Sequence, residues 1–223
     1  MGKLGWIIPV AITGTLVLVA GGIYLSIMDL NKSSFKPEDI STEHVLQRQL
    51  VRSLEKTSEE KKIDYILWLD SDMVFEPDLL IRLLTDAVEN DLDFVTGLCF
   101  SRVLPTKPTI CKTVLWGQDK EGNTQGGAEI YMDYPKDQLF EIEGAGLACA
   151  LVKLSVIDEI GMKCKMSPFQ PLPQLSEDYS FCFRMKQLGH KMWCDSRVKV
   201  GHVGDFVFDE KLFLKQESEK NGQ

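Results

Sequence analysis

The chain contains 223 residues with a mass of 25.2 kDa, of which 44% are hydrophobic, 26% charged and 9% aromatic. This composition is typical of one globular domain with a substantial core, and it excludes a disordered tail protein, a collagen and a membrane bundle of several spans. The formal net charge of -8 disfavours a basic surface for nucleic acid, so we expect no nucleic-acid partner.

The first segment of the chain, residues 4–28, carries no charged side chain. A helix rises about 1.5 Å per residue, so this segment is long enough to cross a hydrocarbon core of about 30 Å. That interpretation predicts a transmembrane helix as a single N-terminal membrane anchor, with the body of the protein in the cytoplasm. The alternative is that the runs IIPVAI and TLVLVA are two buried parallel strands, because such strands also read as continuous apolar runs.

The composition then divides the chain into four parts. The apolar segment 1–30 is followed by polar residues 31–43, which predict a linker. Residues 44–209 predict one globular domain that begins with a helix over about 44–60, and the charged residues 210–223 predict a C-terminal tail.

Within this domain, predicted strands and helices alternate. The segment YILWLD at 65–70 predicts a buried strand, and the leucine spacing after Glu76 predicts a helix that packs on a sheet. DFVTGLCF at 93–100 predicts the next strand. Residues 105–138 contain proline and glycine with little periodicity, which indicates a hairpin or a surface loop.

The C-terminal half continues the alternation. A glycine-marked turn at 141–149 leads into a short strand and a helix closed by Gly161. Ser176 caps a helix that ends at Gly189, and 191–200 predicts the last strand. The alternation of strands and helices predicts an α/β fold with a mainly parallel central sheet.

The six cysteines form no CxxC pair, and most lie in apolar runs. We therefore expect free buried thiols, a reducing compartment and no zinc site, although the even count leaves disulfides open. The cysteines are Cys99, Cys111, Cys149, Cys164, Cys182 and Cys194.

The triplet Asp70-Ser71-Asp72 is a DxD motif at the end of a predicted buried strand. Two carboxylates two residues apart in an extended turn can converge on one hard cation, and oxygen ligands select Mg²⁺ or Mn²⁺. Such a cation would stabilise a departing diphosphate. The competing interpretation is a solvated turn whose aspartates cap the next helix.

Two further candidates lie in the C-terminal half. Glu177 and Asp178 begin a predicted helix, where a carboxylate can act as a general base or simply favour the helix N-terminus. His202 lies near two glycines after the last predicted strand, where a neutral imidazole can bind a metal or remain a surface histidine. The other two histidines, His44 and His190, are assigned to surface or packing roles.

Three segments of the chain resemble, in the same order, the nucleotide-sugar glycosyltransferases of the type-A fold. YILWLDSDMVFEPDLLIRLL followed by DFVTGLCFSR is similar to the metal-binding strand and following helix of family-two-like glycosyltransferases, which include a branch common in phages and bacteria. SEDYSFCFRMKQLGHKMWCDSRVKVGHVG is similar to the base-bearing helix and closing strand of that family. The resemblance covers about residues 44–204 and implies a single Rossmann-like domain that is abbreviated at its N-terminus.

The resemblance also implies roles for individual residues. Asp70, Ser71 and Asp72 would contact the cation and the nucleotide sugar, and His202 would complete the metal site. Asp178, beside Glu177, would be the catalytic base. The residues that would line the sugar or acceptor pocket are Glu143, Gly144 and Ala145.

These roles predict a metal-dependent glycosyltransferase of the hexosyltransferase type. Its donor would be a UDP- or GDP-linked sugar, its cofactor Mn²⁺ or Mg²⁺, and its acceptor a hydroxyl of a glycan, lipid or protein. Only residues 1–69 precede Asp70, whereas the family uses its first strands to hold the nucleotide base. This short front half favours the alternative of an inactive, membrane-anchored or soluble glycan-binding scaffold. A sugar nucleotidyltransferase is a further alternative, but no basic phosphate loop is present near the start.

Overall fold

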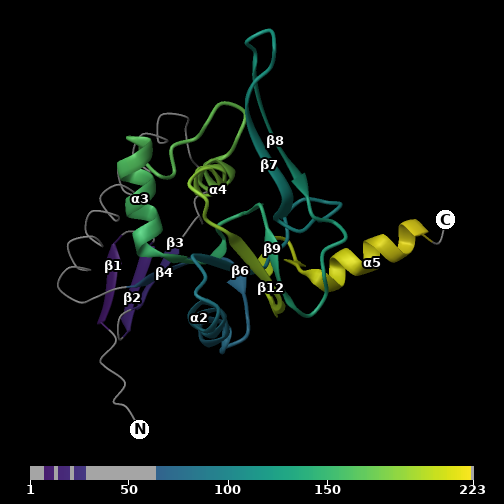
Figure 1. The fold of residues 1–223 in the computed structure, drawn as a ribbon. Helices are drawn as coiled ribbons and strands as arrows, with labels where there is room; N and C mark the ends of the chain where they lie inside the picture. The colour runs from purple at the N-terminus through teal and green to yellow at the C-terminus, as the bar shows by residue number, and fades with distance from the viewer. Residues whose placement is uncertain (1–7, 13–14, 21–22, 29–63, 222–223) are drawn as a thin grey trace.

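The computed structural model describes residues 8–12, 15–20, 23–28 and 64–221, with only the backbone of the strands described before residue 64. An eight-stranded sheet in the order β1-β2-β3-β4-β11-β6-β12-β9 runs through the molecule (Figure 1). Its strands are β1 (Ile8–Ile12), β2 (Thr15–Ala20), β3 (Ile23–Met28), β4 (Tyr65–Asp70), β11 (Cys149–Lys153), β6 (Phe94–Leu98), β12 (Met192–Lys199) and β9 (Leu139–Ile142).

The sheet mixes parallel and antiparallel neighbours. β3 and β4 pair in parallel, as do β6 and β12, while β11 lies antiparallel between β4 and β6. Strands β1, β3, β4, β6 and β12 consequently run in one direction, and β2, β11 and β9 run in the other. The predicted α/β class is confirmed, and the sheet is mixed, since two of its seven neighbouring pairs are parallel and five are antiparallel.

The apolar N-terminal segment provides three strands of this sheet. β1, β2 and β3 form an antiparallel meander, and β3 continues the sheet onto β4. The predicted transmembrane helix over residues 4–28 is wrong where the structure describes this segment, since its many β-branched residues adopt extended backbone. The alternative of strands is correct in kind, but it expected two parallel strands. None of the helices in the described part of the chain is long and apolar enough to cross a membrane.

Helices cover both faces of the sheet. α2 (Leu79–Glu89) packs on one face, whereas α3 (Leu154–Cys164) and α4 (Glu177–Gln187) pack on the other (Figure 1). β4 serves both layers, because Leu67 faces the α2 side and Ile66 faces the α3 and α4 side. This double burial explains why the strand reads as a continuous apolar run.

Two helix ends test the capping predictions. The Ser176 side chain accepts a hydrogen bond from the Tyr179 backbone N–H at 3.3 Å, so the predicted N-cap of α4 is confirmed. The prediction that Gly161 closes α3 is wrong, because the helix continues to Cys164 and ends where Lys165 adopts a left-handed backbone. A Cβ at Gly161 would meet nothing within 4 Å, so this glycine lies on an open face of the helix and does not end it.

The segment predicted as a charged tail forms helix α5 (Glu210–Asn221). Its first turn is anchored, since Phe213 is buried against the rings of Phe100 and Tyr134. Glu210 Oε1 also accepts a hydrogen bond from the Tyr134 hydroxyl at 2.9 Å. The predicted helix over 44–60 and the linker 31–43 lie outside the described residues.

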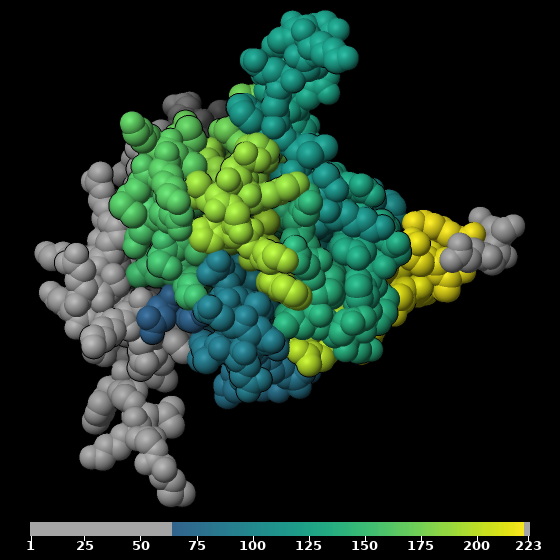
Figure 2. Space-filling model, viewed as in Figure 1, coloured from purple at the N-terminus to yellow at the C-terminus, as the bar shows by residue number. Residues whose placement is uncertain are grey.

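Residues 105–138 contain a long hairpin, which confirms one of the two predicted forms. β7 (Ile110–Gln118) pairs with β8 (Thr124–Ile130) on one side and with the short β10 (Gly144–Ala145) on the other, and the hairpin projects beyond the body (Figures 1 and 2). At the tip, the Asp119 carboxylate accepts hydrogen bonds from the backbone N–H groups of Glu121 and Asn123.

The six cysteines are free, and all but the half-buried Cys164 are buried. The prediction of free thiols is therefore confirmed.

A small third sheet joins segments that are distant in sequence. β13 (Gly201–Val203) lies between β14 (Val207–Phe208) and β5 (Met73–Val74), with His202 opposite Met73. This pairing brings the residues after the last long strand beside the turn that follows β4.

Candidate functional site

The turn after β4 is held on both sides by backbone hydrogen bonds. The Asp70 N–H donates to the Ala148 carbonyl at 3.0 Å, and the Val203 N–H donates to the Asp72 carbonyl at 2.8 Å. Ser71 lies exposed between the two aspartates. The two carboxylates therefore stand on a turn whose position is fixed by the sheet edge and by β13.

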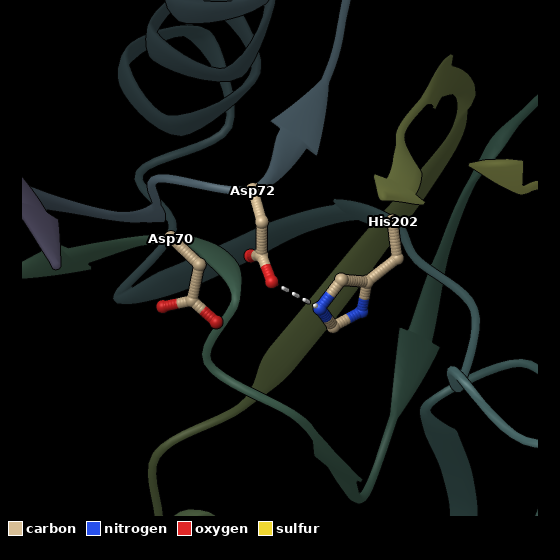
Figure 3. Close-up of side chains that lie close together, drawn as sticks. All are labelled: Asp70, Asp72 and His202. Carbon is tan, nitrogen blue, oxygen red and sulfur yellow. Dashed lines mark ion pairs between the residues drawn. The ribbon is translucent and has the colours of Figure 1, made fainter. Parts of the chain in front are cut away.

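Asp70, Asp72 and His202 come together at this edge. One side-chain ligand atom of each lies within 4.8 Å of the others, and all three residues are half-buried. Figure 3 shows the two carboxylates and the imidazole pointing toward a shared space. These are the three residues predicted from the sequence as metal ligands, and the fold places them together.

The hydrogen bonding of the His202 ring is compatible with a metal ligand. Its Nδ1 lies 3.3 Å from the Phe100 carbonyl oxygen, which can only accept, so we assign the ring proton to Nδ1 and a lone pair to Nε2. Burial lowers the pKa of His202, and the Asp72 carboxylate acts in the opposite direction. A neutral ring with a free Nε2 is the form that coordinates metals.

Two atoms of the group lack hydrogen-bond partners. His202 Nε2 lies 3.3 Å from Asp72 Oδ2, but in the described part of the chain neither Nε2 nor the buried Asp72 Oδ1 forms a hydrogen bond. Buried polar atoms normally have a partner, and a cation bound at this group would supply one to both atoms. The donor set of two carboxylates and one imidazole therefore fits a divalent cation such as Mn²⁺ or Mg²⁺.

The electrostatics of the group also favour a cation. Burial and, second, the negative charge of Asp72 raise the pKa of Asp70 to about 6, while the Arg102 guanidinium opposes this shift. Repulsion between the two carboxylates is thus only partly relieved by nearby protein groups.

Arg102 is a site residue that the sequence analysis missed. Its Nη1 lies 2.6 Å from Asp72 Oδ2. It follows β6, which runs in the same direction as β4, so both strands end at the same edge of the sheet. A basic residue shortly after a second buried strand was the signal available in the sequence.

Asp178 lies in the first turn of α4, and the loop 146–148 connects it to the metal candidates. Its Oδ2 accepts a hydrogen bond from the Leu147 N–H at 3.2 Å, and the next residue, Ala148, holds the Asp70 N–H. Burial raises the pKa of Asp178 to about 7, with smaller contributions in the same direction from Glu177 and Asp70. Glu177 itself is exposed.

Gly146 leaves room beside Asp178. A Cβ on this glycine would lie 3.7 Å from Asp178 Oδ2 and 3.4 Å from the Thr109 Cβ. Gly146, Leu147 and Ala148 are further residues not predicted from the sequence, although they lie within the glycine-marked turn 141–149.

The structure does not bring Glu143 to this group. Its Oε2 accepts hydrogen bonds from Lys186 Nζ at 2.5 Å and from the Val114 N–H at 3.3 Å. Lys186 lies in the last turn of α4, about 12 Å along the helix from Asp178.

Gly144 and Ala145 pack between the hairpin and α4. A Cβ on Gly144 would lie 2.5 Å from the Val114 Cγ2, and Ala145 is fully buried with its N–H directed to Cys182 Sγ at 3.4 Å. Their contacts are those of packing residues.

The sequence matches no protein-family model and no curated protein. Among solved structures, the chain is similar to A197 from STIV, with 19% identity over 72% of this chain and 68% of that chain, and a TM-score of 0.45. It is also similar to GalNAc-T7, solved with UDP, GalNAc and Mn²⁺, with 11% identity over 70% of this chain and 30% of that chain, and a TM-score of 0.43. At these identities and scores, neither neighbour identifies the chemistry of this chain.

Proposed function

We propose that the protein is a metal-dependent glycosyltransferase that moves a sugar from a nucleoside diphosphate sugar to a hydroxyl acceptor. The observation that carries this proposal is the convergence of Asp70, Asp72 and His202 with two buried acceptor atoms that have no hydrogen-bond partner among the described residues. The half-buried carboxyl of Asp178, one loop away, supplies a candidate base. The resemblance to family-two-like glycosyltransferases and to their phage and bacterial branch rests on the three sequence segments.

In this proposal Asp72 and His202 hold the cation, and Asp70 completes the ligand set. A bound Mn²⁺ or Mg²⁺ would supply Lewis-acid stabilisation of the departing diphosphate. The backbone bonds of Asp70 to Ala148 and of Asp72 to Val203 keep the ligands in place, so that little reorganisation accompanies binding.

Asp178 then accepts the proton of the acceptor hydroxyl. The Leu147 N–H orients its carboxylate through Oδ2, which leaves the other oxygen to act as the base. A pKa of about 7 suits this role, because a general base is most effective when its pKa lies near the working pH. Glu177 contributes a negative charge beside this base rather than a second one.

We also propose a donor, an acceptor and a cellular compartment. The donor is a UDP- or GDP-linked sugar, and the acceptor is a hydroxyl on a glycan, a lipid or a protein. The six free cysteines support a reducing compartment such as the cytoplasm.

The test is calorimetric titration of the full-length chain with UDP and with GDP, each with and without Mn²⁺. We expect one nucleotide to bind only when Mn²⁺ is present, and Asp72→Ala to weaken that binding at least about 100-fold, because it removes a charged ligand. Asp78→Ala is the matched control, since Asp78 also pairs with an arginine but lies on the exposed start of α2. If the wild-type chain binds neither nucleotide with Mn²⁺, the proposal fails and the inactive scaffold takes its place.

A further inference from the structure

Arg102 and a divalent cation would compete for the same oxygen. Arg102 Nη1 lies 2.6 Å from Asp72 Oδ2, the same oxygen that faces His202 Nε2 at 3.3 Å. A guanidinium so close to the ligand group already supplies part of the positive charge that the carboxylates attract. A divalent cation placed among Asp72 and its neighbours would be repelled by that guanidinium.

The surroundings of Arg102 allow its side chain to move while the loop stays folded. The base of the loop is closed by Ser101, whose N–H donates to the Lys107 carbonyl at 2.9 Å and whose carbonyl accepts from the Thr106 hydroxyl at 2.7 Å. Beyond this base, Arg102 has a side chain that is 44% exposed, whereas Asp72 is only 18% exposed. The arginine can therefore leave the ion pair toward solvent, and the aspartate stays fixed.

A diphosphate is the natural second partner for this guanidinium. Arginine presents a planar fork of N–H donors that matches phosphate oxygens and binds them in pairs. A donor diphosphate held by a cation at Asp70, Asp72 and His202 would lie beside the loop that carries Arg102.

We propose that Arg102 is an exchangeable counter-cation, which pairs with Asp72 until the divalent cation binds and then transfers to the diphosphate of the nucleotide donor. This inference rests on the proposed function and adds a binding residue to it. It makes two predictions of opposite sign for one substitution, because Arg102 opposes binding of the cation alone and favours binding of the nucleotide.

The experiment titrates Mn²⁺ alone, and then UDP and GDP in saturating Mn²⁺, into four full-length proteins: the wild type, Arg102→Ala, Arg102→Lys and Arg82→Ala. Arg82 is a matched control, since its side chain is 48% exposed, close to the 44% of Arg102, and its Nε pairs with Asp78 at 2.7 Å away from the three proposed ligands. Thermal melting of each variant verifies that it is folded. We expect Arg102→Ala to bind Mn²⁺ about tenfold more tightly and the nucleotide about tenfold more weakly, whereas Arg82→Ala matches the wild type.

The Arg102→Lys variant distinguishes the effect of the positive charge from the effect of the planar guanidinium. It keeps a positive charge near Asp72, so the Mn²⁺ affinity should stay close to that of the wild type, while the loss of the planar fork should weaken nucleotide binding by a smaller factor than in Arg102→Ala. The inference is overturned if Arg102→Ala leaves the Mn²⁺ affinity unchanged or lowers it, or if nucleotide affinity does not fall. A wild-type chain that binds no Mn²⁺ overturns the proposed function as well, so the two failures are distinguishable.

Discussion

Two histidines lie at opposite ends of the parallel strand pair β6 and β12, and their ring nitrogens differ in hydrogen bonding. His190 precedes β12, and its ring nitrogens lie 2.7 Å from Asp93 Oδ2 and 3.2 Å from Glu159 Oε2. His202 follows β12, and its Nε2 forms no hydrogen bond within the described residues. Their side chains are 15% and 14% exposed, so burial does not explain the difference.

This difference in hydrogen bonding distinguishes the structural cluster around His190 from the proposed binding site around His202. At the amino end, Lys153 also pairs with Asp91 and Asp93, so the charges there are matched within the protein. At the carboxyl end, acceptors outnumber donors around Asp72. Buried polar groups are normally satisfied, so an unsatisfied set indicates where a ligand belongs.

The largest expected effect concerns Asp178, the proposed base. Asp178→Asn keeps the shape of the side chain but cannot accept a proton, and general-base catalysis typically contributes about 100- to 10,000-fold. We expect turnover to fall by about that factor while Mn²⁺-dependent nucleotide binding stays within about twofold. Sugar transfer and calorimetry measure the two quantities, and a variant that keeps most of its turnover would remove Asp178 from the mechanism.

The same residue predicts the pH dependence of the reaction. Burial and nearby carboxylates raise the pKa of Asp178 to about 7, and only its deprotonated form is a base. The kcat/KM of the wild-type enzyme should therefore rise with pH and level off above about pH 7. A profile that is flat from pH 5 to 8 contradicts this assignment.

The two histidines provide a reciprocal pair of substitutions. His202→Ala should weaken Mn²⁺ binding by about 10- to 100-fold and destabilise the fold less than His190→Ala, because it removes a proposed ligand and a single hydrogen bond, to the Phe100 carbonyl. His190→Ala should leave Mn²⁺ binding unchanged and lower the free energy of unfolding by about 1–3 kcal/mol, since it strips two carboxylates of a shared partner. Mn²⁺ titration and urea unfolding of both variants make the comparison, which fails if the two substitutions have the same pattern of effects.

Local features of the fold were predictable because they depend on neighbouring residues. The bounds of β4, the cap at Ser176 and the hairpin after β6 follow from apolar periodicity, side-chain capping and turn residues. Even here a local rule failed at Gly161, because Lys165 adopts the left-handed conformation that ends α3. The interpretation of residues 4–28 stayed divided, since an apolar run satisfies a helix and a buried strand equally well.

The partners of the site residues were not predictable in the same way. Asp72 and Arg102 are 30 positions apart, and Leu147 and Asp178 are 31 apart, so only the tertiary fold joins them. Glu143 shows the same limit, because its pairing with Lys186 at the far end of α4 carries no local signature. Residue type indicated the candidate ligands, while their partners depend on the order of strands in the sheet.

The smallest expected effect tests a buried acceptor that lies away from the site. Asp86 Oδ2 also lacks a hydrogen-bond partner among the described residues, but burial and the neighbouring Asp195 raise the pKa of Asp86 to about 6, so a proton can satisfy it where a cation would at Asp72. A carboxyl whose pKa is higher in the folded state stabilises the fold at low pH, and this contribution is lost as the pH rises from about 4 through 6. Asp195 does not cancel this trend. Arg197 holds the pKa of Asp195 below its ordinary value, so the contribution of Asp195 to stability is complete by pH 4.

Asp86→Asn supplies a permanent N–H donor. The unfolding free energy of this variant should therefore fall by about 1 kcal/mol less than that of the wild type between pH 4 and 7. Urea unfolding at several pH values measures how the unfolding free energy of each protein changes with pH. Equal changes in the two proteins would mean that Asp86 does not bind a proton in this range.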